Sequence, residues 1–284
     1  MHYRQLVAVG IAAVLLVMMV HRTSVHRNWC GALNKPKFTG GISDVGLNAW
    51  LPKGAHVDGS FWQRAALPPS TLPEQYYGQD LEDKYAQENF FSGLQSGTYV
   101  EMGAHNGVTG SNTLYFAQRG WKGLLIEPNT HSYRSLVMNR PDAICVNAAI
   151  CENSTQVHFV EAEVVGGIFE FMAPNFVAEW HPNVSIEELP VIACVSLGAV
   201  LAKAGLTSIN FFILDVENAE LQVLKTLDFS LVRFDVIVVK AHGGSESKYE
   251  DVKQLLRDNN YNYHGPVVRN DWFVHASYVN SSPV

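Results

Sequence analysis

The sequence predicts a doubly wound α/β sheet, in which parallel strands lie between two layers of helices. Strand and helix patterns alternate along the body of the chain, as they do in parallel sheets. The runs Phe211–Leu214 and Val236–Val239 are apolar at every position, which is typical of strands covered on both faces. With 284 residues, of which 47% are hydrophobic, the chain can bury one sizeable core.

The first part of the body contains three predicted strands with helices before and between them. Apolar residues follow a helical spacing from Asp80 to Leu94, and a second helix is expected roughly from Gly110 to Arg119. The three strands are expected at Thr98–Met102, Gly123–Ile126 and Ala143–Asn147, with helices between them.

The second part contains an insertion and then resumes the alternation. After the third strand we expect a short extra strand at Gln156–Glu161, a Gly166-Gly167 turn, and a polar and aromatic insertion to about Leu189 that has no recognisable motif. The remaining elements are strands at Phe211–Leu214 and Asp235–Val239, helices at Ala219–Leu227 and Lys248–Asp258, and two closing strands near Tyr261–His264 and Trp272–His275. The closing strands are expected to form an antiparallel hairpin.

The N-terminus is predicted to be a separate element. From Leu6 to Val20 every residue is apolar or Gly, a run of about 22 Å at about 1.5 Å per helical residue. An uncleaved signal-anchor helix over residues 1–22 is the favoured interpretation, because no small-x-small cleavage site follows Val20. A cleaved signal peptide and a buried core helix are the alternatives.

A stem or linker is expected over residues 23–75, where Gly, Pro, Asn and isolated aromatic residues show no helical or strand period. The globular domain is expected over residues 76–280. Three glycosylation sequons begin at Asn153, Asn183 and Asn280. Together with the apolar run they predict a single-pass type II membrane protein of the endoplasmic reticulum or Golgi, with the endosome or plasma membrane as further destinations.

Cysteines and charge give weaker information. Cys30 lies in the stem, and Cys145, Cys151 and Cys194 lie in the body, without zinc-site spacing, so the cysteines predict no metal site. Cys145 and Cys151 either close a short loop or are buried free thiols. A formal net charge of −7 argues against nucleic acid as a partner.

The segment from Thr98 to Asn129 predicts a nucleoside-binding site. A strand ending in Glu101-Met102 is followed by a turn with Gly103 and Gly107, and the next strand ends in Glu127. Glycines let main-chain amides approach a ligand closely, and an acid at the end of the second strand can bind a ribose diol. The phosphate-binding Gly-x-Gly-x-x-Gly pattern is missing, so the segment favours S-adenosylmethionine over NAD.

The candidate catalytic residues follow the strand at Phe211–Leu214. Asp215 and Glu217 are expected at the carboxyl end of that strand, where either could accept a proton from a hydroxyl or bind a divalent ion. Capping of the following helix by these acids is the alternative. His242, beside Gly243-Gly244, is a further candidate, and an exposed loop histidine without function is its alternative.

Several segments resemble the FkbM-type class I methyltransferases over roughly residues 81–275. These segments are GTYVEMGAHNGVTGSNTLYF, GWKGLLIEPN, NRPDAICVNAAIC and INFFILDVENAELQVLKTLDF. The resemblance implies a seven-stranded Rossmann-like sheet, S-adenosylmethionine as cofactor, and transfer of a methyl group to a hydroxyl oxygen of a glycan, lipid or small molecule. The residues that it implies for the cofactor are Glu101, Gly103, Ala104, His105, Gly107, Glu127, Pro128, Asn129, Asn147 and Ala148. Gly103 and Gly107 could instead serve only a tight turn, Glu127 could cap a helix, and His105 could be a solvent-facing turn residue.

Two departures from the family pattern leave a second function open. Asn218 stands where relatives have Gly, and Lys240 stands where they have Glu. Asn can adopt the same left-handed backbone as Gly, whereas Lys240 could neutralise Asp215 or Glu217, or indicate lost turnover. Membrane-anchored animal members of the family resemble the protein Star, which assists export of growth-factor precursors in EGF receptor signalling. The alternative is therefore a trafficking factor that binds a membrane-protein client.

Overall fold

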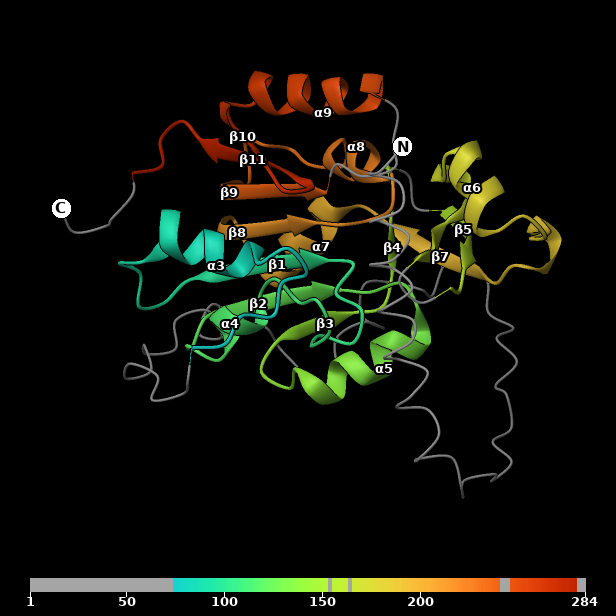
Figure 1. Cartoon of the computed structure of the whole chain (residues 1–284), viewed down its shortest axis with the longest axis horizontal. Helices are drawn as coiled ribbons and strands as arrows, with labels where there is room; N and C mark the ends of the chain where they lie inside the picture. The colour runs from blue at the N-terminus through green and yellow to red at the C-terminus, as the bar shows by residue number, and fades with distance from the viewer. Residues whose placement is uncertain (1–73, 153–154, 163–164, 241–245, 280–284) are drawn as a thin grey trace, which may run out of the picture. The chain divides into compact units, whose positions relative to one another are not determined.

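The computed structural model describes residues 74–152, 155–162, 165–240 and 246–279 (Figure 1). These residues all belong to the second of two compact units, which covers residues 45–284. The predicted signal anchor, the stem up to residue 73, and His242 lie outside the described residues. Among the helices that are described, none is long and apolar enough to span a membrane.

The centre of this unit is a seven-stranded sheet in the order β10-β11-β9-β8-β1-β2-β3. Five neighbouring strands, from β9 to β3, run parallel, and β11 and β10 form the antiparallel hairpin expected at the end of the chain. The strands are β1 (Thr98–Met102), β2 (Lys122–Ile126), β3 (Ile144–Val146), β8 (Ser208–Leu214), β9 (Arg233–Lys240), β10 (Tyr261–Val267) and β11 (Asn270–His275). The predicted doubly wound sheet is therefore confirmed.

Successive side chains along a strand point to opposite faces of the sheet. Because the strands are apolar at successive positions, both faces are apolar, and each is covered by helices. One face carries Val100, Phe212 and Ile237 and packs on the helices α7 (Leu197–Ala204), α8 (Glu220–Leu224) and α9 (Glu246–Asp258). The other carries Tyr99 and Phe211 and packs on the helices α3 (Glu82–Ala86), α4 (Leu114–Ala117) and α5 (Thr130–Asn139). Figure 1 shows α5 and α9 beside opposite ends of the strand order.

Two predicted helices are shorter than the sequence pattern suggested. The helix expected from Asp80 to Leu94 consists of α3 followed by a wider π-helical segment, Gln87–Phe91, whose Phe90 and Phe91 enter the core. The helix expected from Gly110 to Arg119 is confined to α4. Its first turn is replaced by a loop, residues 107–113, whose polar side chains bond to the sheet and are described below.

The insertion after β3 forms a second sheet that the sequence did not predict. Only β5 (Thr155–Val160) matches an expected strand, and it lies in the order β4-β7-β5-β6 with β4 (Ala149–Ile150), β6 (Gly167–Ile168) and β7 (Val191–Val195). Helix α6 (Pro174–Trp180) lies beside this sheet (Figure 1). The expectation of a single extra strand in this region is thus corrected, because the other three strands are too short and too mixed in polarity to be seen in the sequence.

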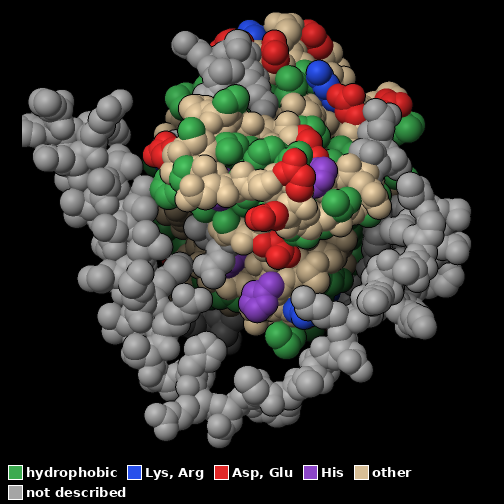
Figure 2. Space-filling view, turned by 90° about the vertical axis from the view of Figure 1, so that its right-hand side faces the viewer, with side chains coloured by type: hydrophobic (Ala, Val, Ile, Leu, Met, Phe, Trp, Pro, Cys, Tyr) green, Lys and Arg blue, Asp and Glu red, His purple; other side chains and the backbone are tan. Residues whose placement is uncertain are grey.

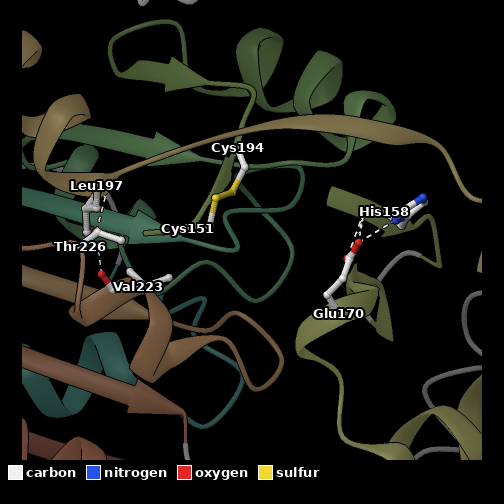
Figure 3. The surroundings of a disulfide bond; sticks show 7 residues. All are labelled: Cys151, His158, Glu170, Cys194, Leu197, Val223 and Thr226. Carbon is white, nitrogen blue, oxygen red and sulfur yellow. Dashed lines mark hydrogen bonds and ion pairs between the residues drawn. A yellow bond between two sulfur atoms is a disulfide. The ribbon is translucent and has the colours of Figure 1, made fainter. Parts of the chain in front are cut away.

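A disulfide joins the start and the end of the insertion. Cys151 follows β4 and is bonded to Cys194 in β7, with the two Cα atoms 5.8 Å apart (Figure 3). Cys145 is a buried free thiol. Of the two alternatives for Cys145 and Cys151, a short loop between them is therefore wrong, because Cys151 has a partner 43 residues away in sequence.

We expect Gly123→Ala in β2 to destabilise the fold strongly. A Cβ at this position would lie 1.7 Å from the ring of Tyr99, and that ring cannot withdraw because its hydroxyl accepts a 2.7 Å hydrogen bond from buried Arg140. Overpacking of this kind costs about 1–3 kcal/mol. Denaturant titration measures the loss, and Glu88→Ala, which truncates an exposed side chain outside the sheet, should change the free energy of unfolding by less than about 0.5 kcal/mol. Equal stability of both variants would contradict the packing described for this strand.

Candidate functional site

Glu127 lies at the carboxyl end of β2 and joins two loops. One carboxylate oxygen accepts a hydrogen bond from the main-chain N–H of His105 and the other accepts one from Asn129, both at 2.8 Å. The side chain is 6% exposed, and burial raises the pKa of Glu127 to about 7, although the two N–H donors lower it. The charge of Asp215 raises it further, so the ends of β2 and β8 lie within electrostatic reach of each other.

The loop after β1 requires glycine for reasons internal to the protein. Gly103 and Gly107 both have φ of 75°, a left-handed conformation that glycine adopts without strain. A Cβ at Gly103 would lie 2.0 Å from the carbonyl oxygen of Asp215, and one at Gly107 would lie 2.6 Å from the side chain of Arg140. Both glycines are therefore needed for the turn itself, and their direct contact with a cofactor stays a prediction. Ala104, between them, is buried.

Glu101 is buried beneath the same loop. Its carboxylate accepts hydrogen bonds from the Ser111 hydroxyl at 3.0 Å, the Asn112 N–H at 2.8 Å and the Thr113 hydroxyl at 2.5 Å. Burial raises the pKa of Glu101, and the nearby Arg140 guanidinium opposes that change. Glu101 thus orders residues 111–113, and through them the loop. Its expected contact with the methionine part of a cofactor stays untested.

Arg140 is a structural residue that sequence reasoning missed. It is 4% exposed and donates to the Gly107 carbonyl, the Tyr99 hydroxyl, and the hydroxyls of Ser111 and Thr113, at 2.7–3.2 Å. The guanidinium therefore connects the loop to β1 and to the end of α5. Nothing in the local sequence indicates this, because its partners lie 27 to 41 residues earlier in the chain.

The residues expected near the adenine hold the ends of β2 and β3 together. Asn147 donates from its amide to the carbonyls of Glu127 at 2.8 Å and Pro128 at 3.0 Å. The Asn129 side chain caps α5 by accepting from the N–H groups of His131 and Ser132. This role of Asn129 shows that Glu127 is not the cap of α5. Ala148, next along the chain, is buried.

The candidate catalytic acids lie at the carboxyl end of β8, opposite Lys240 at the end of β9. The ammonium of Lys240 is 2.7 Å from a carboxylate oxygen of Asp215 and 4.0 Å from one of Glu217. Burial and the charge of Asp215 together raise the pKa of Glu217 to about 8, against the lowering effect of Lys240. Burial lowers the pKa of Lys240, but the two carboxylates outweigh it and the net pKa is raised. Glu217 therefore holds a proton near neutral pH.

The loop after Asp215 is strained. Glu217 and Asn218 have φ values of 49° and 76°, so Asn218 adopts the left-handed backbone expected of a residue that replaces Gly. The N–H of Asn218 donates to the Glu220 carboxylate at 3.1 Å, and neither Asp215 nor Glu217 has a capping hydrogen bond with α8 among the described residues. The side-chain amide of Asn218 is buried at 2% exposure without a partner among those residues. Strain and an unpaired buried amide together are typical of functional loops.

A second charged group at this edge of the sheet was also missed. Arg269, immediately before β11, forms a two-pronged ion pair with Asp80 at 2.8 and 2.9 Å. Asn270 pairs with Lys240 across the strands, and its amide donates to the buried carboxylate of Glu82 at 2.7 Å. Residues 80–82 read as the start of a helix in the sequence, so their pairing with the β10–β11 hairpin could not be predicted.

The insertion lies against the candidate catalytic loop. A Cβ at Gly167 in β6 would be 3.5 Å from the Cβ of Glu217. From residue 141 to 202 the chain has no Lys or Arg and eight acids, which are Asp142, Glu152, Glu161, Glu163, Glu170, Glu179, Glu187 and Glu188. Figure 2 shows the face that carries this part of the chain, with Asp and Glu side chains gathered near its middle. The charges that act on Glu217 itself come from Asp215, Glu220, Lys240 and Arg269 rather than from these acids.

The structure brings most of the predicted site residues to one edge of the main sheet. Glu127, Asn147, Asp215 and the glycine loop all follow the carboxyl ends of parallel strands, where open α/β sheets bind ligands. His242 lies outside the described residues. Within the described parts of the chain, no group of three or more His, Cys, Asp or Glu residues could hold a metal ion.

Comparison with known proteins gives one family match. The sequence model described as "Methyltransferase FkbM domain" matches residues 101–263. No curated protein sequence matches the chain.

Three solved structures illustrate the structural likeness. A TehB-like SAM-dependent methyltransferase from Corynebacterium glutamicum is 10% identical over 71% of this chain and 89% of that chain, with a TM-score of 0.38. A precorrin-6y C5,15-methyltransferase from Geobacter metallireducens is 10% identical over 72% and 91%, with a TM-score of 0.39. Aeropyrum pernix fibrillarin with bound S-adenosyl-L-methionine is 11% identical over 63% and 66%, with a TM-score of 0.31. With TM-scores below 0.5, these likenesses carry no inference about activity.

The raised pKa of Glu127 predicts a loss of stability with rising pH. The folded state keeps the proton up to about pH 7, whereas the unfolded carboxyl loses it near pH 4.5, so the stabilisation is present below pH 4.5 and disappears as pH rises through 7. We expect this residue to contribute about 1–3 kcal/mol of the decline. Denaturant titrations at several pH values should show a shallower decline in Glu127→Ala and an unchanged one in Glu88→Ala, which removes an exposed acid. Equal slopes in all three proteins would refute the assignment.

Proposed function

The chain belongs to the FkbM methyltransferase family, and on that premise we propose that it transfers a methyl group from S-adenosylmethionine to a hydroxyl oxygen. The observation that carries the proposal is the gathering of Glu127 and Asp215 at one edge of the sheet, close enough for one charge to raise the pKa of the other carboxyl. Glu127 is suited to binding a nucleoside. Asp215 begins the loop that also carries Glu217, whose carboxylate is suited to removing a proton.

The residues around Glu127 fit the ribose of this cofactor. Each carboxylate oxygen accepts one main-chain N–H, which leaves a lone pair on each oxygen for a sugar hydroxyl. Two hydroxyl donors would stabilise the charged form, which burial alone disfavours. His105, Asn129 and Asn147 would then hold Glu127 and its neighbours in place, and the main chain at Gly103 and Ala104 would face the methionine part.

Glu217 is the residue that we assign as general base. When bound, S-adenosylmethionine supplies an electrophilic methyl group whose bond to sulfur breaks as the acceptor oxygen attacks. The Glu217 carboxylate accepts the hydroxyl proton, and a pKa of about 8 makes it a stronger base than an ordinary carboxylate. Asp215 orients Lys240 through the 2.7 Å ion pair, and Lys240 keeps Glu217 from becoming still harder to ionise.

We infer a neutral or cationic acceptor from the acidic composition of the insertion. Eight acids and no Lys or Arg between residues 141 and 202 disfavour a phosphate or sulfate group on the acceptor. A hydroxyl of an uncharged glycan, lipid or small molecule fits better. The apolar run Leu6–Val20 supports attachment to a membrane, and the Cys151–Cys194 disulfide supports an oxidising lumen such as that of the endoplasmic reticulum or Golgi.

A non-catalytic, Star-like trafficking role is the second candidate. The observation in its favour is the ion pair between Lys240 and Asp215, because it neutralises one of the two candidate catalytic carboxylates. In that role the fold would bind a membrane-protein client in the secretory pathway. Cofactor binding distinguishes the two candidates.

Calorimetric titration of the purified full-length protein with S-adenosylmethionine tests the first candidate. We expect micromolar binding, lost in Glu127→Ala because the ribose hydroxyls lose their acceptors, and retained in Glu88→Ala. Circular dichroism of Glu127→Ala checks that the fold persists, since the N–H groups of His105 and Asn129 lose their partner. A folded wild-type protein that gives no heat would favour the trafficking role.

Replacement of the base should separate chemistry from cofactor binding. We expect Glu217→Gln to lower methyl transfer about 10²- to 10⁴-fold, the usual contribution of a general base, with unchanged S-adenosylmethionine affinity. Incorporation of radiolabelled methyl groups into extracted membranes of the producing cells measures the rate, which should rise with pH up to about 8 in the wild type. Glu188→Gln, an exposed acid of the insertion, is the control. Full activity of Glu217→Gln would exclude Glu217 as the base.

A further inference from the structure

One of the three sequons lies on a surface suited to modification. Asn183 is exposed in the turn between α6 and β7, within the insertion. The turn is closed by a hydrogen bond from the N–H of Val184 to the carbonyl of His181 at 3.1 Å. Ser185 has extended backbone angles, φ −108° and ψ 129°. The asparagine amide therefore projects from a short, ordered turn rather than from a helix or a strand.

The surroundings of Asn183 leave room for a bulky group. Pro182 and Glu187 are exposed, and the Ser185 hydroxyl bonds to the carboxylate of Glu187, a surface contact that a modifying enzyme can displace. None of the predicted cofactor or catalytic residues belongs to this turn. The same insertion carries the Cys151–Cys194 disulfide, so its oxidised form and a glycosylated asparagine require the same compartment.

We propose that Asn183 carries an N-linked glycan in the mature protein. The inference rests on the lumenal orientation proposed above and not on methyl transfer. In the reaction, the amide nitrogen of Asn183 forms a bond to the anomeric carbon of a lipid-diphosphate-linked oligosaccharide. The bond from that carbon to the diphosphate oxygen breaks, the lipid diphosphate leaves with the electron pair, and the amide proton is lost to solvent. Oligosaccharyl transfer requires both Asn183 and the hydroxyl of Ser185.

The test uses the full chain expressed in secretory cells, with the sequons at residues 153 and 280 removed by Asn153→Gln and Asn280→Gln. We expect a single mobility shift that endoglycosidase abolishes. Asn183→Gln and Ser185→Ala should each remove the shift, and Ser185→Thr should retain it because threonine completes the sequon equally well. A shift that persists in Asn183→Gln, or no shift in this background, would overturn the proposal.

A reporter sequon separates failure of the site from failure of the orientation. Asp228 is exposed, and its carboxylate oxygen accepts from the N–H and hydroxyl of Ser230. Asp228→Asn keeps that acceptor oxygen and completes a sequon with Phe229 and Ser230. In a chain without the three natural sequons, a shift from Asp228→Asn shows a lumenal domain. If the reporter is modified and Asn183 is not, the Asn183 assignment is wrong and the orientation stands. If neither is modified, both are wrong, and methyl transfer is still tested by calorimetry.

Discussion

The buried carboxylate of Glu127 is the constraint on which the candidate site depends. Its two oxygens hold the loop after β1 and the start of α5 through the N–H groups of His105 and Asn129. Burial of a carboxylate is costly unless hydrogen bonds compensate, and two donors leave its pKa at about 7. A ligand that adds hydroxyl donors would complete the compensation, so binding and ionisation of this group are linked.

The sequence predicted the sheet because its strands are apolar at positions facing both helix layers. β1, β2, β8 and β9 all lie within one or a few residues of their expected bounds, and the closing hairpin was also expected. The edge of the sheet at which the site lies followed from the same pattern, since Glu127 and Asp215 stand directly after apolar runs. The local sequence pattern is sufficient to predict a strand that is buried on both faces along its whole length.

The sequence could not predict which side chains contact each other when they lie far apart along the chain. Arg140 bonds to residues 27 to 41 positions earlier, Arg269 pairs with Asp80, and Cys151 pairs with Cys194 rather than with Cys145. The strands of the insertion are two to six residues long and alternate weakly, so they carry little periodic signal. Lys240 was recognised as unusual, but its 2.7 Å contact with Asp215 depends on the register between β8 and β9.

The bond between Cys151 and Cys194 fastens the two ends of the insertion at one point beside the main sheet. The Cα atoms of these two cysteines lie 5.8 Å apart, so the disulfide holds the two ends of the segment between them close together. The length and the side chains of such a segment can change during evolution without altering the strands that support Glu127 and Asp215. The insertion can therefore diverge while the strand ends that carry the candidate site stay the same.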